Sequence, residues 1–190
     1  MSNNNHTIRT FLALPLPHHL QKEIYTFAQS LHSLPLRLVP PNQLHITLKF
    51  IGHTPTTKVP SIWEKVQPLL ASTPTLQLQL NGITAFPNPQ KPNVLCLQIQ
   101  PQPTLQQLVH QLEQTLLNLG IPKNKRPFLP HITFARTKRK TQSKINLHQL
   151  LQNTHFSYQI TLTQAILYQS QLQPKGAVYT PLFQTTLNSS

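Results

Sequence analysis

His45-Ile46-Thr47-Leu48 and His131-Ile132-Thr133-Phe134 are two copies of one His-x-Thr-x pattern, and they begin 131 − 45 = 86 positions apart in a chain of 190 residues. Each copy lies in a stretch where polar and apolar residues alternate, which is typical of a β-strand with one buried face. Residues two apart in a strand face the same side, about 6.8 Å from each other. The histidine and threonine of each copy therefore share a face, and the apolar residues share the other.

Two histidines and two threonines suit acid–base chemistry at a phosphate ester. Because histidine titrates near neutral pH, one neutral imidazole can accept a proton from water while a second, protonated one donates to a leaving alkoxide. Threonine adds a hydroxyl donor for the non-bridging phosphate oxygens, and its β-branch restricts χ1. One copy alone would indicate only an ordinary cross-strand polar pair. The repetition leads us to expect that His45, Thr47, His131 and Thr133 are catalytic.

Paired histidines are also found in zinc sites, which take three or four ligands. Threonine is a poor ligand, and no third motif with cysteine or carboxylate accompanies the two copies. Sites for Mg²⁺, Ca²⁺ or two metals draw on several carboxylates, whereas this sequence contains only three Asp and Glu residues. We therefore expect neither a metal nor a cofactor.

The composition is strongly basic, with 16 Lys and Arg against 3 Asp and Glu and a net charge of +13. Such a balance favours a polyanionic partner. Half of the positive charge lies between residues 123 and 144, on both sides of the second motif. A basic run can equally be a solvated face, but its position beside a candidate anion site favours substrate binding.

The chain is long enough to bury a core without a disulfide or a structural metal. Its single cysteine, Cys96, lies in the apolar run 94–97 and is predicted to be a buried small side chain rather than a reactive thiol. The apolar stretch 11–16 is short and contains proline, and nothing approaches the ~20 apolar residues of a membrane span. We expect a cytoplasmic protein with no membrane association.

Hydrophobic periodicity predicts a mixed order of helices and strands. We expect helices at 17–34, 57–71, 104–119 and 145–152, and strands at 8–14, 44–51, 76–80, 94–99, 131–136, 156–169 and 178–187. Gly52 should end the strand that carries the first motif, and Thr104 should cap its helix. The order differs from a doubly wound parallel sheet, and there is no glycine-rich phosphate loop. The prediction is an α+β fold of mostly antiparallel strands, one domain over residues 1–190.

The similarity to a known family extends from about residue 9 to residue 187. Besides the two motifs it includes residues 9–14, 48–52 and 126–130, and residues 167–170 followed by Tyr179. These segments resemble the RNA 2′,3′-cyclic phosphodiesterase family, also described as 2′-5′ RNA ligase-like, of the two-histidine (2H) phosphoesterase superfamily. The resemblance implies a bilobal fold of two mostly antiparallel sheets with helices outside, related by a pseudo-two-fold axis, whose motifs face a central cleft.

The resemblance also implies a reaction, the metal-independent opening of an RNA 2′,3′-cyclic phosphate to leave a 2′-phosphate. His45 would be the general acid that protonates the 3′ oxygen, and His131 the general base that activates water. Thr47 and Thr133 would hold the phosphate. The partner implied is RNA or an oligonucleotide with a cyclic phosphate end, and the protein is expected to be a monomer.

Phe50 and Arg136, each five positions after its motif histidine, are the residues that the resemblance assigns to nucleotide contact. Five is odd, so in a regular strand both would point away from the histidines. They can reach the cleft only if the strand ends, twists or bulges first. Arginine offers a bidentate fork to phosphate, whereas Phe50 could equally be part of the core.

Two other functions remain open at this point. One is 2′-5′ RNA ligation, which is the same chemistry reversed, with an RNA hydroxyl in place of water. The other is a non-catalytic basic RNA-binding module, whose affinity would fall steeply with salt.

Overall fold

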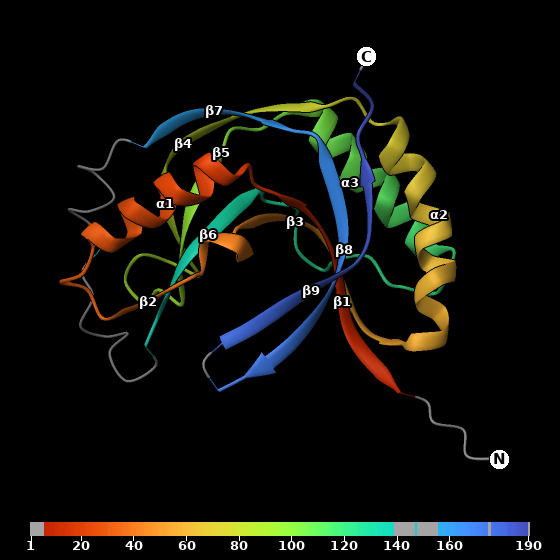
Figure 1. Ribbon diagram of the computed structural model, residues 1–190, viewed down its shortest axis with the longest axis horizontal. Helices are drawn as coiled ribbons and strands as arrows, with labels where there is room; N and C mark the ends of the chain where they lie inside the picture. The colour runs from red at the N-terminus through yellow and green to blue at the C-terminus, as the bar shows by residue number, and fades with distance from the viewer. Residues whose placement is uncertain (1–5, 139–146, 148–155, 175, 190) are drawn as a thin grey trace.

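The computed structural model describes residues 6–138, 147, 156–174 and 176–189, and its strands form a curled antiparallel sheet accompanied by three α-helices (Figure 1). Apart from Leu147, the helix predicted at 145–152 lies outside the described residues, as does part of the basic segment, residues 139–144. Along the chain the elements are β1 (Thr7–Pro15), α1 (His18–Ser30), β2 (Leu36–Leu38), the 3-10 helix η1 (Pro41–Gln43), β3 (His45–Pro55), η2 (Thr56–Lys58), α2 (Val59–Ser72), β4 (Leu76–Phe86), β5 (Val94–Ile99), α3 (Pro103–Leu117), β6 (His131–Thr137), β7 (Ser157–Leu162), β8 (Gln164–Gln173) and β9 (Gly176–Thr186).

The prediction of two sheets was wrong, because the strands form one sheet in the order β7-β4-β5-β6-β3-β1-β8-β9, with β2 on β6. The two motif strands, β3 and β6, are neighbours and pair through Ile46 and Ile132. Each would otherwise present an open edge of unpaired backbone groups. This pairing divides the sheet into a β3 half (β3, β1, β8 and β9) and a β6 half (β6, β5, β4, β7 and β2).

The inner strands of the two halves are connected in the same way. β1 leads through α1, followed by the short elements β2 and η1, to its antiparallel neighbour β3, and β5 leads through α3 to its antiparallel neighbour β6. The helices, however, cross over. The α1 residue Phe27 packs edge-on against Phe134 of β6 with ring centroids 5.7 Å apart, and α3 packs against β3. Each half is thus covered by the helix of the other, which resists their separation.

Four apolar side chains anchor the two motif strands in the hydrophobic core. Ile46, Leu48, Ile132 and Phe134 are all buried, which confirms the predicted apolar face of each motif. Burying an aliphatic or aromatic side chain of this size stabilises the fold by about 1.5–3 kcal/mol. The opposite faces of β3 and β6, which carry the histidines and threonines, are only partly buried.

Several element boundaries differ from those predicted. β3 continues through Gly52, whose φ is 93°, because the glycine tolerates this conformation without interrupting the strand. α3 is capped by Gln102, not Thr104; the Gln102 side-chain oxygen accepts a hydrogen bond from the N–H of Leu105 at 2.6 Å. The stretch 156–169 forms parts of two strands, β7 and β8, and the short strand β2 was not predicted.

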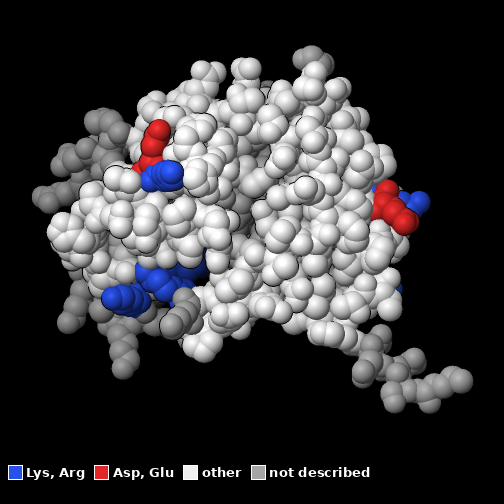
Figure 2. Space-filling view, in the orientation of Figure 1, with Lys and Arg blue, Asp and Glu red and all other residues white. Residues whose placement is uncertain are grey.

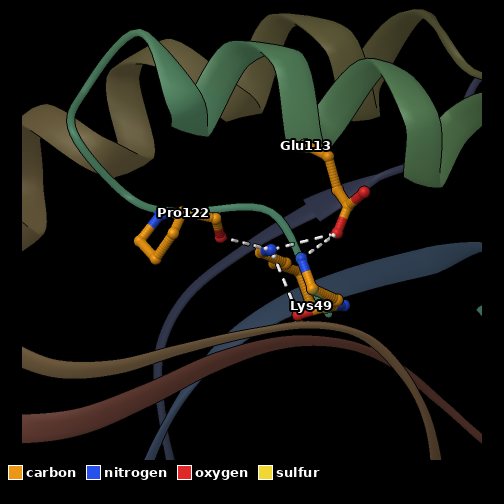
Figure 3. A network of polar contacts seen from close by, with 4 residues as sticks. Lys49, Glu113 and Pro122 are labelled. Carbon is orange, nitrogen blue, oxygen red and sulfur yellow. Dashed lines mark hydrogen bonds and ion pairs between the residues drawn. The ribbon is translucent and has the colours of Figure 1, made fainter. Parts of the chain in front are cut away.

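A buried lysine ties β3 to the segment that leads into β6 (Figure 3). Lys49 is 1% exposed, and its ammonium donates to Glu113 Oε1 at 3.0 Å, to the Pro122 carbonyl at 2.8 Å and to Asn124 Oδ1 at 3.1 Å. Three acceptors satisfy its three donors. Burial alone would raise the pKa of Glu113, but hydrogen bonds from the Asn124 N–H and Lys49, with the charge of Lys49, lower it.

We expect Lys49→Met to lower the free energy of unfolding by about 3 kcal/mol, because it removes the charge partner of the partly buried Glu113 carboxylate and leaves two oxygens without their donor. Urea denaturation measures this change. Lys58→Met is the matched control, because Lys58 is exposed and its replacement should change stability by less than about 0.5 kcal/mol. Equal effects of the two substitutions would contradict the role of the Lys49 network.

Candidate active site

A cavity of about 420 Å³ lies where the two halves of the sheet meet. The six residues that the sequence predicts for the site all line it: His45, Thr47, Phe50, His131, Thr133 and Arg136. Its size lies in the range of small-molecule sites. The chain therefore brings together side chains from two strands that are distant in sequence.

A β-bulge in β3 accounts for the position of Phe50. Thr47 lies opposite Ala13 and Lys49 opposite Leu12, so Leu48 has no partner in β1. Leu48 and Lys49 are both buried as a result, and the alternation of faces shifts by one residue. Phe50 then lies on the cavity side with 62% of its surface exposed. The alternative prediction, that Phe50 belongs to the core, was wrong.

β6 contains a bulge at the equivalent position. Thr133 lies opposite Cys96 and Ala135 opposite Leu95, so Phe134 is the extra residue. Phe134 and Ala135 are both buried, and Arg136 reaches the cavity. The two motif strands thus use the same irregularity to bring their sixth residue back to the face of the histidine.

Both imidazoles are oriented by the main chain. Nδ1 of His45 lies 2.6 Å from the Gln43 carbonyl, and Nδ1 of His131 lies 2.7 Å from the Leu129 carbonyl. A carbonyl only accepts, so each Nδ1 carries the proton and donates it, which leaves each Nε2 available for chemistry. Nε2 of His45 is 3.1 Å from Thr47 Oγ1, which can donate its hydroxyl proton to a neutral ring.

The two histidines have different surroundings. The ring of His45 packs against Phe11 at 5.1 Å, Tyr179 at 5.2 Å and Tyr168 at 6.3 Å between centroids. Burial lowers the pKa of His45 to about 4; the Gln43 carbonyl opposes this, and the positive charges of His131 and Arg136 add to it. His45 is therefore neutral at pH 7 in the protein alone. Among the described residues, His131 contacts one ring, that of Phe86, at 5.1 Å.

Thr133 has a neighbour that the motifs did not predict. Cys96 is buried, as expected, and its Sγ lies 3.4 Å from Thr133 Oγ1. Burial raises the pKa of Cys96 to about 11, against the opposing effects of Thr133 and Arg136. The thiol is therefore protonated at neutral pH. It forms a hydrogen bond with the threonine hydroxyl from the core side.

Sequence reasoning missed three other contributors to the site: Arg37, the carbonyls of Gln43 and Leu129, and the aromatic side chains around His45. The carbonyls carry no side-chain signal. Arg37 lies on β2, which was not predicted. Tyr168 and Tyr179 belong to the family resemblance, but only the strand order places them against His45.

The described residues lack two features that would indicate other kinds of site. In this part of the chain, no group of three or more His, Cys, Asp and Glu residues is arranged to hold a metal ion. No helix among the same residues is long and apolar enough to cross a membrane.

The fold and the paired motifs place this protein in a known superfamily. Residues 16–173 match the model of the 2′-5′ RNA ligase superfamily, and the chain therefore belongs to it. A curated relative from Methanothermobacter thermautotrophicus is 28% identical over 92% of this chain and 96% of its own length, and one from Archaeoglobus fulgidus is 27% identical over 92% and 98%. Both are named RNA 2′,3′-cyclic phosphodiesterase.

A solved structure from Thermus thermophilus has the same architecture. It superposes with a TM-score of 0.82 at 27% identity and covers 96% of this chain and 99% of its own. The family resemblance inferred from the motifs is thus confirmed.

The ring of His45 should titrate with a midpoint near pH 4 in the protein alone, because its burial disfavours the charged form. NMR of the imidazole Cε1–H measures this, and the spectrum of His45→Gln identifies the signal. Added inorganic phosphate should raise the midpoint, because a nearby anion favours the imidazolium. A midpoint at the ordinary 6.5 in the protein alone would contradict the burial of the ring.

Proposed function

We propose that this protein hydrolyses RNA 2′,3′-cyclic phosphate ends to 2′-phosphates by metal-independent general acid–base catalysis. The observation that carries the proposal is that two imidazoles, each oriented through Nδ1, and two threonines line one cavity. The names of the relatives support the choice of substrate. The described residues that line the cavity include no carboxylate, and two imidazoles are fewer ligands than zinc takes.

In the proposed reaction, Nε2 of His131 accepts a proton from a water molecule as the water oxygen attacks phosphorus. The bond between phosphorus and the 3′ oxygen breaks, and His45 donates its Nε2 proton to that oxygen. The phosphate remains on the 2′ oxygen. The hydroxyls of Thr47 and Thr133 donate hydrogen bonds to the non-bridging oxygens, where negative charge increases in the transition state.

The low pKa of His45 gives the substrate a part in this scheme. A general acid must be protonated, and His45 is neutral at pH 7 in the protein alone. A bound phosphodiester anion raises the pKa of a neighbouring imidazole, because it favours the charged form. We infer that substrate binding is accompanied by proton uptake at His45.

Phe50 and Arg136 complete the proposed substrate contacts. The exposed ring of Phe50 offers a surface on which an unpaired base can stack, a contact worth about 1–3 kcal/mol per base. The Arg136 guanidinium offers two parallel N–H donors to phosphate oxygens.

The superfamily description gives the reverse reaction a specific basis as the second candidate. An RNA hydroxyl would replace water: His131 would accept its proton as it attacks phosphorus, and His45 would protonate the leaving 3′ oxygen, as in hydrolysis. Comparing the rates on cyclic phosphate ends with and without an added 5′-hydroxyl RNA separates ligation from hydrolysis.

The main test is turnover of a short RNA with a 2′,3′-cyclic phosphate end, in the presence of a chelator. We expect a 2′-phosphate product, and a loss of about 10²- to 10⁴-fold for both His45→Ala and His131→Ala. His53→Ala is the matched control, because His53 is an exposed residue of β3 that does not line the cavity. Inhibition by the chelator, a 3′-phosphate product, or no turnover by the folded wild type would each contradict the proposal.

A substrate with a good leaving group distinguishes the roles of the histidines. Nitrophenolate leaves without being protonated, so thymidine 3′-(4-nitrophenyl phosphate) needs the general base but not the general acid. We expect His45→Ala to retain most of the wild-type rate on this ester, and His131→Ala to lose it. The opposite pattern would reverse the assignment, with His131 as the acid.

A further inference from the structure

Two arginines lie side by side in the lining of the cavity. Arg37 of β2 is the register partner of Arg136 of β6, and directly opposed residues of an antiparallel pair project from the same face. Both side chains line the cavity that contains the motifs. The family resemblance predicts Arg136 for the site, whereas Arg37 belongs to no motif.

This arrangement is unfavourable unless an anion compensates it, because like charges directly opposed across strands repel each other. Among the described residues, neither guanidinium has a carboxylate or a hydrogen-bond acceptor as partner, and the ion pair of Lys49 lies on the core side. Figure 2 shows Lys and Arg atoms gathered in the hollow at the lower left, with the red acidic atoms of that view lying away from it. The pair has the character of an anion site.

The cavity also continues past the two arginines. A second hollow of about 860 Å³ shares Arg37, Arg136 and Gln173 with the first, and Lys138 and Leu172 extend it. Leu172 is 71% exposed and gives this hollow an apolar surface beside its positive charge. A ligand that fills the first cavity can therefore extend between the arginines into the second.

The guanidinium of Arg37 lies at a distance from the two histidines. It lies against Gly176, 3.5 Å from where a Cβ would stand. Tyr179, which packs on His45, is three residues further along β9, or about 10 Å. An anion on Arg37 is thus distinct from one held between the two histidines.

We propose that Arg37, together with Arg136, binds the phosphodiester one nucleotide upstream of the reacting end. The proposal rests on the function proposed above and narrows its substrate class to RNA oligonucleotides, in preference to cyclic mononucleotides. The guanidinium fork binds two oxygens of the upstream phosphate, and the second hollow holds the nucleotide to which that phosphate is attached.

The first test compares kcat/KM for adenosine 2′,3′-cyclic phosphate and for an adenosine dinucleotide with the same end. The wild type should prefer the dinucleotide, and Arg37→Gln should reduce this preference about 10- to 100-fold, mainly through KM, because it removes a hydrogen bond between charged groups. Arg37→Lys should restore part of it. A dinucleotide with an uncharged methylphosphonate linkage should show no preference that depends on Arg37.

Arg9→Gln is the matched control, because Arg9 is an exposed strand arginine that lines neither hollow. It removes the same charge and should leave the preference unchanged. An equal loss in Arg9→Gln, or an equal loss on both substrates in Arg37→Gln, would overturn the proposal.

A binding measurement separates this proposal from the proposed reaction. Calorimetry with adenosine 2′-phosphate and with a dinucleotide ending in a 2′-phosphate requires no turnover. Wild-type protein should bind the dinucleotide more tightly, and Arg37→Gln should lose about 10-fold or more of that difference. If the protein turns over neither substrate but keeps this Arg37-dependent difference in affinity, the result contradicts the proposed reaction and supports the proposed anion site. If the difference is absent, the anion site fails.

Discussion

The alternation of side chains along a β-strand is the constraint on which this site depends. A motif strand sends apolar residues into the core and its histidine and threonine into the cavity, and a regular strand gives each face every second residue. The bulges at Leu48 and Phe134 change this allocation once in each strand. Positions one, three and six of the motif strand then face the cavity, and positions two, four and five are buried. Without the two bulges, Phe50 and Arg136 would face the core.

The separation of the two histidines depends on a few contacts at the centre of the molecule. β3 and β6 pair directly only at Ile46 and Ile132, so this junction fixes the register of the motifs but leaves little backbone bonding to hold it. The remaining contacts between the two halves come from α1, which packs against β6, from α3, which packs against β3, and from Lys49. Lys49 follows the bulge in β3 and is bonded to the segment that leads into β6, so the irregularity that exposes Phe50 also links the two motifs.

The sequence could predict whatever depends on local periodicity. The motif strands and α3 were predicted within a few residues, because their apolar residues repeat with a clear period. The single sheet was not, because the choice of strand partners depends on tertiary packing. β2 has three residues, too few for alternation to show, and Arg37 was missed with it. A bulge is defined only by the pairing of two strands. The sequence alone therefore could not predict which face of β3 carries Phe50.

The motifs are equivalent in sequence, but the outer strands make them chemically different. Both rings donate Nδ1–H to the carbonyl two residues before them, so the local chain treats them alike. In the β3 half, Phe11 of β1, Tyr168 of β8 and Tyr179 of β9 surround His45 and lower its pKa to about 4. In the β6 half, Phe86 of β4 contacts His131. Two motifs with the same sequence pattern therefore differ chemically because of the strands packed around them, and this difference is not encoded in the motifs themselves.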